Sequence, residues 1–199
     1  MNVTAEPNYE FNTKRVNPKK FALWLLMIAI SMLFAGLTSA VLVRMGEGNW
    51  LHFKLPVQFL YSTLTIVLSS LTMWWAYRSA KNDELMQLKA GLIATFILSL
   101  GFCYLQYMGW KAMSEQGLFF ADDLNGDRVS ASFVYALSGL HLAHIMGGII
   151  FIIIQIFQAF SLNIHRKKLL SINMCNTYWH FVGILWVYLF LFFYFAHLK

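Results

Sequence analysis

Five long stretches of the chain contain no Asp, Glu, Lys or Arg, and more polar segments separate them. They cover residues 21–43, 56–77, 90–110, 130–160 and 174–197. A helix needs about 20 apolar residues to cross the roughly 30 Å of hydrocarbon in a bilayer, and every stretch reaches that length. Because a backbone in lipid must satisfy its own hydrogen bonds, each stretch is expected to be helical. The pattern predicts an all-α, polytopic membrane protein, a bundle of five transmembrane helices.

Composition agrees with this class. Of the 199 residues, 59% are hydrophobic and 12% are charged, whereas soluble proteins have about 25% charged residues. Residues 1–20 are expected to form a polar cytoplasmic tail, and residues 21–199 the transmembrane domain. The run 21–43 is longer than the h-region of about 7–15 residues in a signal peptide, so we interpret it as the first span.

The basic residues predict an orientation. With the N-terminus inside, the cytoplasmic segments 1–20, 78–89 and 161–173 hold ten of the 15 Lys and Arg residues, and the outer segments hold five. Cytoplasmic loops carry an excess of Lys and Arg, which favours N-in, C-out. The net charge of +6 is therefore read as an orientation signal and a possible contact with anionic lipid, and no nucleic-acid partner is expected.

Small residues recur at helical spacing in three of the predicted spans, where they would allow close approach of helix backbones. These stripes are Ser31, Ala35 and Ser39; Ser62, Thr65, Ser69 and Thr72; and Gly139, Ala143 and Gly147. His141, His144 and Gly148 form a second face of this span. At 100° per residue, the centre of this face lies about 130° around the helix from the Gly139 stripe. The fourth span is therefore expected to contact other helices on two faces.

Three histidines lie inside the predicted spans, where ionisable groups are rare and mark functional candidates. His141 and His144 are one turn apart, and His180 shares a face with Asn173, Asn176 and Gly183. Hydrogen bonds to neighbouring helices are the favoured role, with Asn176 or a backbone carbonyl as the partner of His180.

A metal or haem site is the alternative for these histidines. No acid lies within any span, and His144 and His180 are expected to differ in depth by roughly 12 Å. Because metal ligands lie about 2 Å from the ion, a shared ion is disfavoured. Gln106 and Trp110 are expected to tie helices together and anchor at the interface. No acid–base pair, nucleophile constellation or phosphate-binding loop is present, so no catalytic, cofactor-binding or metal-binding residue is assigned.

Several motifs together resemble one known family. Tyr178-Trp179-His180-Phe181-Val182, followed by Trp186, resembles the last helix of subunit III of haem–copper terminal oxidases. The pair His141-x-x-His144, between Gly139 and Gly147, is similar to the penultimate helix of that family. The middle helices are matched by Leu55-Pro56, Ser69-Ser70-Leu71-Thr72, Trp74, Gly101 and Gln106. The chain is identified from about residue 21 as a member of the cytochrome c oxidase subunit III family, five-helix bacterial type.

The resemblance implies a non-catalytic subunit in a bacterial inner membrane. It implies that haem and copper reside in partner subunits I and II, and that subunit I is the main contact. Other implied partners are phospholipids, further respiratory subunits and a supercomplex with a quinol-oxidising complex. The holoenzyme would carry electrons from cytochrome c or quinol to O₂ and pump protons, while this chain stabilises subunit I and sustains proton uptake.

The chain departs from the family pattern at three places. Residues 28–33 contain no acid, and glycines stand at 109 and 183, where many members have a carboxylate. Roles that rest on those carboxylates are therefore not carried over. Two other assignments stay open, a subunit III-like protein of a nitric oxide reductase and a haem-binding cytochrome b-type anchor.

Overall fold

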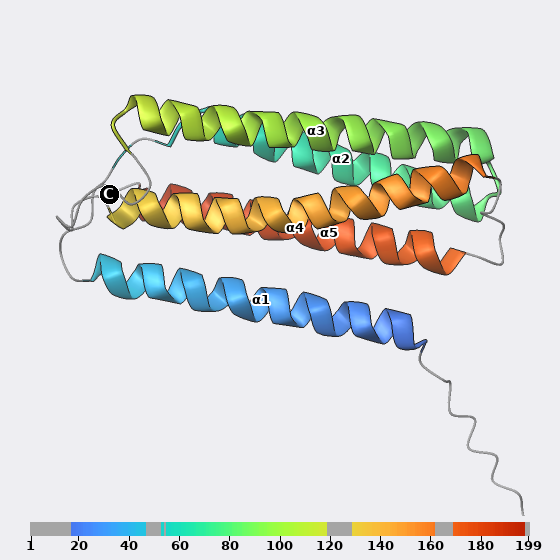
Figure 1. The fold of residues 1–199 in the computed structure, drawn as a ribbon, viewed down its shortest axis with the longest axis horizontal. Coiled ribbons are helices and arrows are strands. Elements are labelled where there is room, and N and C mark those ends of the chain that lie inside the picture. The colour runs from blue at the N-terminus through green and yellow to red at the C-terminus, as the bar shows by residue number, and fades with distance from the viewer. Residues whose placement is uncertain (1–16, 47–52, 54, 119–128, 162–168, 198–199) are drawn as a thin grey trace, which may run out of the picture.

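The computed structural model describes residues 17–46, 53, 55–118, 129–161 and 169–197, and these residues form five α-helices and no strand. The helices are α1 (Pro18–Met45), α2 (Gln58–Lys81), α3 (Leu85–Glu115), α4 (Val129–Phe160) and α5 (Leu169–His197) (Figure 1). All five are long and apolar enough to cross a membrane. The predicted all-α, five-helix membrane architecture is confirmed.

The helices extend beyond the charge-free stretches that predicted them. α3 is 31 residues long and includes Lys89 and Lys111, because a helix can continue past the hydrocarbon, where charged side chains meet water and headgroups. α1 begins at Pro18, inside the segment expected to be a tail. Asn17 caps it by accepting a hydrogen bond from the backbone N–H of Lys19 at 3.2 Å, and proline is favoured in a first turn.

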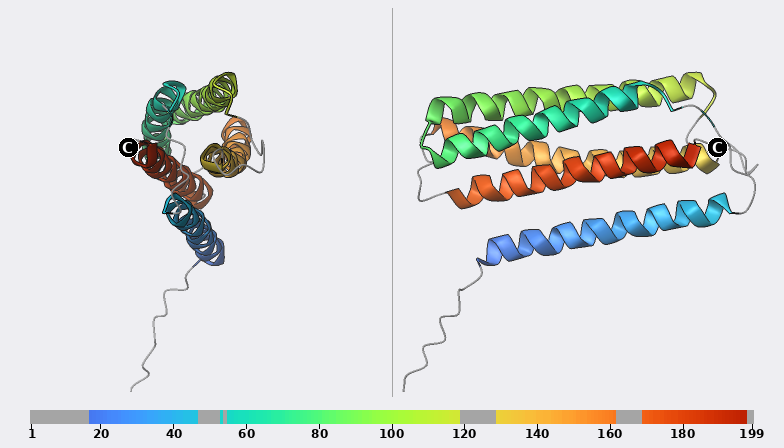
Figure 2. Two further views of the ribbon diagram at one scale, coloured as in Figure 1. Left: turned by 90° about the vertical axis from the view of Figure 1, so that its left-hand side faces the viewer. Right: turned by 180° about the vertical axis from the view of Figure 1, so that it is seen from behind.

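Four of the helices form a ring. α2 contacts α3 and α5, and α4 contacts the same two helices, while α1 lies outside the ring against α4 and α5 (Figure 2). Successive helices run antiparallel, so α1 begins and α5 ends at opposite ends of the bundle (Figure 1). This arrangement places α2 and α5 side by side, although they are far apart in the sequence.

α1 packs on the ring through one narrow stripe with three- and four-residue spacing. Its buried residues are Leu23, Met27, Ile30, Phe34, Thr38 and Val41. The small residues Ser31, Ala35 and Ser39 are exposed, so the expectation that they form the packing face is wrong within this chain. The stripe with larger side chains removes more apolar surface from lipid, and Ser31 donates to the Met27 carbonyl of its own helix at 2.9 Å.

α2 and α3 approach each other most closely at Gly91. A Cβ atom on this residue would lie 2.8 Å from the Cβ of Ala76, far inside the usual contact distance of about 3.5–4.0 Å. Small residues on both helices therefore fix the separation of the pair, as expected where helices pack in lipid.

Candidate functional site

Four hydroxyl residues of α2 join it to α3 and α5, and we call them the α2 polar seam. Their side-chain partners are Gln106 Nε2 to Ser62 Oγ (2.8 Å), Trp186 Nε1 to Thr63 Oγ1 (3.0 Å), Trp179 Nε1 to Ser69 Oγ (3.1 Å) and Thr95 Oγ1 with Thr72 Oγ1 (2.8 Å). Because bonds of this kind contribute about 0.6–1.7 kcal/mol each in a membrane, the seam stabilises the position of α2 in the ring.

Each serine of the seam is both a hydrogen-bond donor and a hydrogen-bond acceptor. Ser62 donates to the Phe59 carbonyl at 2.9 Å and Ser69 to the Ile66 carbonyl at 2.8 Å. A hydroxyl oxygen also carries two acceptor lone pairs, and these receive the N–H groups from α3 and α5. The donors and acceptors of α2 are therefore paired inside the bundle.

His141 occupies an aromatic box made by three other helices. Its ring centroid lies 6.2 Å from that of Phe34, 6.1 Å from that of Phe102 and 5.1 Å from that of Trp186. The residue is 0% exposed, and neither ring nitrogen has a hydrogen-bond partner among the described residues. The imidazole thus acts here as a packing element that connects α1, α3, α4 and α5.

His144 bonds to its own helix. Its Nδ1 lies 2.7 Å from the Leu140 carbonyl oxygen, and its backbone carbonyl accepts a hydrogen bond from the Tyr178 hydroxyl at 3.0 Å. Among the described residues, neither the His141 nor the His144 side chain has a polar partner on a neighbouring helix, so the interhelical hydrogen bonds expected for them stay a prediction. The neighbours at their level are aromatic rings, including Phe34 at 5.7 Å from the His144 ring.

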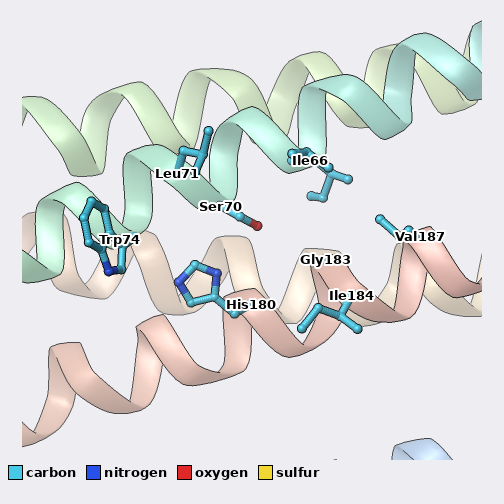
Figure 3. Close-up of a pocket in the computed structure, with 9 residues that line it drawn as sticks. Ile66, Ser70, Leu71, Trp74, His180, Gly183, Ile184 and Val187 are labelled. Atoms are coloured by element: carbon cyan, nitrogen blue, oxygen red, sulfur yellow. The ribbon is translucent and has the colours of Figure 1, made fainter.

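His180 lies half-buried on the wall of a groove between α2 and α5 (Figure 3). It makes no hydrogen bond with Asn176, although the two are one turn apart. The buried Oδ1 of Asn176 likewise has no partner among the described residues. The expected Asn176–His180 pair is thus absent from the described part of the chain.

The three histidines do not converge on one point. Gly148 abuts Trp179, which puts His144 and His180 only about 4–5 Å apart in depth at 1.5 Å per residue, less than expected. The two side chains instead point in different directions. Tyr178 of α5 points toward His144, and His180, two residues later, lies about 200° further around the axis of α5. The described residues contain no group of three His, Cys, Asp or Glu side chains that could hold a metal ion.

Gly148, and not Gly147 or Gly139, is where α4 closely approaches α5. A Cβ on Gly148 would lie 3.0 Å from two ring carbons of Trp179, whereas Gly147 is exposed and Gly139 half-buried. The predicted second packing face of α4 is used only in part: a Cβ on Gly139 would lie 4.0 Å from Trp110 and one on Gly147 3.7 Å from the Tyr178 hydroxyl, while Ala143 is exposed. The sequence did place Gly148 on the face of His141 and His144, and that position carried the informative signal.

Two glycines lie where an added side chain would crowd side chains of α2. The Phe59 ring comes within 3.2 Å of a Cβ built on Gly109, and Ser70 Oγ within 2.9 Å of one built on Gly183. These are the positions where the family resemblance led us to expect carboxylates in many members. In this chain, side chains of α2 occupy the space beside these glycines and pack directly against the backbones of α3 and α5.

Polar contacts also link other helix pairs. Trp110 Nε1 donates to Ser138 Oγ at 2.9 Å, joining α3 to α4. Gln155 Nε2 donates to Ser171 Oγ at 2.7 Å, joining α4 to α5. Sequence reasoning singled out Trp110 but missed Gln155, although a buried amide within an apolar run is itself a signal of an interhelical contact.

These features define a multi-pass α-helical membrane protein whose interior polar groups mainly join helices. The family model described as cytochrome c oxidase subunit III matches residues 20–197. The chain belongs to the cytochrome c oxidase subunit III family, whose members are subunits of haem–copper oxidase complexes.

The similar proteins include subunits of cytochrome c oxidases and of a ubiquinol oxidase. The chain is 25% identical to cytochrome c oxidase subunit 3 of Bacillus sp. (strain PS3) over 177 residues, covering 86% of this chain and 83% of the relative. It is 28% identical to cytochrome bo(3) ubiquinol oxidase subunit 3 of Buchnera aphidicola over 189 residues, covering 89% and 94%. A probable cytochrome c oxidase subunit 3 of Mycobacterium bovis is 28% identical over 174 residues, covering 82% and 81%.

Proposed function

We propose that this chain is the non-catalytic subunit III of a haem–copper terminal oxidase and that it stabilises the catalytic subunit I. The α2 polar seam is the observation that carries the proposal. The hydroxyl oxygens of Ser62 and Ser69 accept hydrogen bonds from Gln106 and Trp179 on neighbouring helices. Groups committed in this way hold a scaffold together and are not free to act on a substrate.

Haem and copper belong, in this proposal, to partner subunits I and II. The histidines of this chain do not suit such a centre, because His141 is enclosed by aromatic rings and His144 Nδ1 is engaged by the Leu140 carbonyl. The relatives include a cytochrome c oxidase subunit and a ubiquinol oxidase subunit. The complex would accordingly oxidise cytochrome c or quinol, reduce O₂ and move protons across the membrane.

The proposed location is a bacterial inner membrane with the N-terminus in the cytoplasm. Three cations lie over aromatic rings at one end of the ring of helices, at the C-terminal ends of α2 and α4 and the first turns of α3. The pairs are Arg78 with Trp74 (5.5 Å), Lys81 with Tyr77 (4.7 Å) and Lys89 with Phe160 (4.8 Å). Cations and aromatic rings of this kind anchor a protein at the headgroups, and the sequence assigns this end to the cytoplasm.

A subunit without redox chemistry influences turnover by stabilising, shaping or shielding its catalytic partner. We infer that this chain sustains proton uptake by keeping the adjacent surface of subunit I in its native shape. Phospholipids, subunit II and a quinol-oxidising complex would complete its surroundings. The presence of this chain should therefore affect the oxidase rate over many turnovers more than the rate of the first turnover.

The test is O₂ consumption against time by the oxidase with and without this chain. Initial rates at acidic pH should be nearly equal, because the redox centres are complete in both preparations. Activity without the chain should then decay faster, and the difference should grow at alkaline pH, where protons are scarcer. Complete loss of initial activity in a fully metallated core would contradict the proposal, since it would mean that this chain takes part in catalysis.

A further inference from the structure

A groove of about 560 Å³ runs between α2 and α5 on the outside of the bundle (Figure 3). Its walls are formed by Ile66, Val67, Ser70, Leu71 and Trp74 of α2 and by His180, Gly183, Ile184 and Val187 of α5. Each wall is about two helical turns long, or roughly 10–12 Å at 1.5 Å per residue. The groove is therefore elongated along the membrane normal and lined mainly by branched apolar side chains.

Three polar groups in this groove have no partner. The Ser70 hydroxyl, the His180 imidazole and the Trp74 indole N–H make no hydrogen bond with any described residue. Ser69, the neighbour of Ser70, points into the bundle and has both its hydrogen-bonding partners. Unpaired polar groups thus gather in the groove, on an uncovered part of α2 and α5.

Lipid cannot satisfy Ser70 and His180 at their depth, whereas Trp74 lies toward the headgroup end of the groove, with Arg78 over its ring at 5.5 Å. Gly183 is the middle residue of α5 (Leu169–His197), so His180 lies only about 4–5 Å from the centre of the helix. Ester and phosphate oxygens of lipids lie about 15 Å from the bilayer centre, at the edge of the hydrocarbon. Acyl chains alone surround the groove there, and an unpaired polar group in hydrocarbon costs several kcal/mol in the isolated molecule. The natural occupant is therefore a polypeptide that carries polar side chains at this depth.

We propose that the α2–α5 groove seats a transmembrane helix of the catalytic oxidase subunit, which inserts a ridge of side chains and offers hydrogen-bonding groups to His180 and Ser70. The inference rests on the proposed function, because it names the surface by which this chain holds its partner. Ridge-into-groove packing is the usual geometry between helices, and two turns of α5 provide the stripe His180, Gly183, Ile184 and Val187.

Other exposed faces lack this combination. The small-residue stripe of α1 is exposed, but Ser31 is satisfied by the Met27 carbonyl. The exposed part of the α4 stripe, Ala143 and Gly147, carries no polar side chain at all. The Ala143–Gly147 face leaves no polar side chain unpaired and the α1 stripe leaves only the Ser39 hydroxyl, whereas the groove leaves both a hydroxyl and an imidazole unpaired.

A photo-crosslinking amino acid placed at position 184 in the assembled oxidase identifies the occupant. Ile184 stands on the groove wall and is 70% exposed, so the probe should reach the partner without disturbing the bundle. Ile97 on α3 (61% exposed) and Ile150 on α4 (57% exposed) give matched control positions away from the groove. We expect a covalent adduct with the catalytic subunit from position 184 and not from position 97.

Substitutions give a second, independent measurement. Ile184→Trp should lower the amount of this chain that copurifies with a tagged catalytic subunit by about tenfold, corresponding to 1.4 kcal/mol, and Ile97→Trp should not. His180→Leu should weaken association by about threefold to twentyfold, the range of one interhelical hydrogen bond. In the purified chain alone, where His180 is unpaired, the same substitution should leave the unfolding midpoint unchanged or raise it.

Four outcomes would overturn the proposal. An adduct with lipid or quinone alone from position 184 would make the groove a ligand site. An adduct with the catalytic subunit from position 150 alone would assign the interface to α4. Equal retention of Ile184→Trp and Ile97→Trp would remove the groove from the interface. A lower unfolding midpoint of His180→Leu in the chain alone would show that the imidazole is already paired. If the unmodified chain failed to copurify with any redox subunit, the proposed function itself would fail, a result distinct from these four.

Discussion

The contact between Gly148 and Trp179 supports a prediction that adjacent glycines can test against each other. A Cβ on Gly148 would lie 3.0 Å from the Cε3 and Cζ3 atoms of Trp179 and 3.3 Å from Cε1 of Tyr178. A Cβ on Gly147 would meet only the Tyr178 hydroxyl, at 3.7 Å. The Gly148→Ala variant should therefore be less stable than the Gly147→Ala variant.

The magnitude follows from two opposing effects. Replacing a helical glycine with alanine gains about 1 kcal/mol of helix propensity at either position. Inserting a methyl group into a packed site costs about 1–3 kcal/mol, and Trp179 cannot move away easily because it is fully buried and bonded to Ser69. Gly147→Ala should gain up to about 1 kcal/mol. Gly148→Ala should range from neutral to a loss of about 2 kcal/mol.

The difference between the two variants isolates the steric effect, because the propensity gain is the same in both. It should be about 1–3 kcal/mol, measured as the free energy of unfolding of the full chain in mixed micelles titrated with a denaturing detergent. Circular dichroism of each folded variant provides the check that helix content is unchanged. Equal stabilities for the two variants would refute the close approach of α4 and α5 at Gly148.

Three further predictions concern the seam, the topology and the cofactor content. Trp179→Phe removes the bond to Ser69 and should lower the free energy of unfolding by about 1 kcal/mol, while Trp24→Phe, at a residue 50% exposed to lipid, should be neutral; a larger effect of Trp24→Phe would count against the seam. Alkaline phosphatase fused after Lys199 should be active and fused after Leu169 inactive, and the reverse pattern would overturn the N-in, C-out orientation. A pyridine haemochrome assay on the purified chain should detect no haem, and stoichiometric haem would favour the cytochrome b-type anchor.

The number and order of helices followed from charge-free runs because hydrocarbon excludes charge strongly at every residue. The faces of those helices were harder to assign. Gly139, Ala143 and Gly147 form as regular a stripe as Ser62 and Ser69 do, yet only the second stripe lies inside the bundle. In lipid an apolar or small side chain is tolerated on either face, so periodicity alone does not distinguish packing from exposure.

Buried amides and indoles were better guides than histidines. Gln106 and Trp179 carry N–H donors that must be paired in lipid, and each bonds to a serine of α2. An imidazole can instead join an aromatic cluster, as His141 does beside Trp186. The sequence identified His141 as an interior residue but could not specify its surroundings, because these arise from three other helices brought together by the tertiary fold.

The position of α1 has a consequence for biogenesis. Of the five helices described, α1 leaves the ribosome first, yet the helices that it contacts, α4 and α5, follow last among the five. At about 5–20 residues per second, α1 must stay in the membrane for several seconds before Val129 and the rest of α4 emerge. Its apolar stripe around Phe34 is exposed to competing helices throughout that interval. The insertion machinery would therefore have to retain α1 until the chain is complete, and nascent chains stalled between α3 and α4 should be unusually sensitive to membrane proteases.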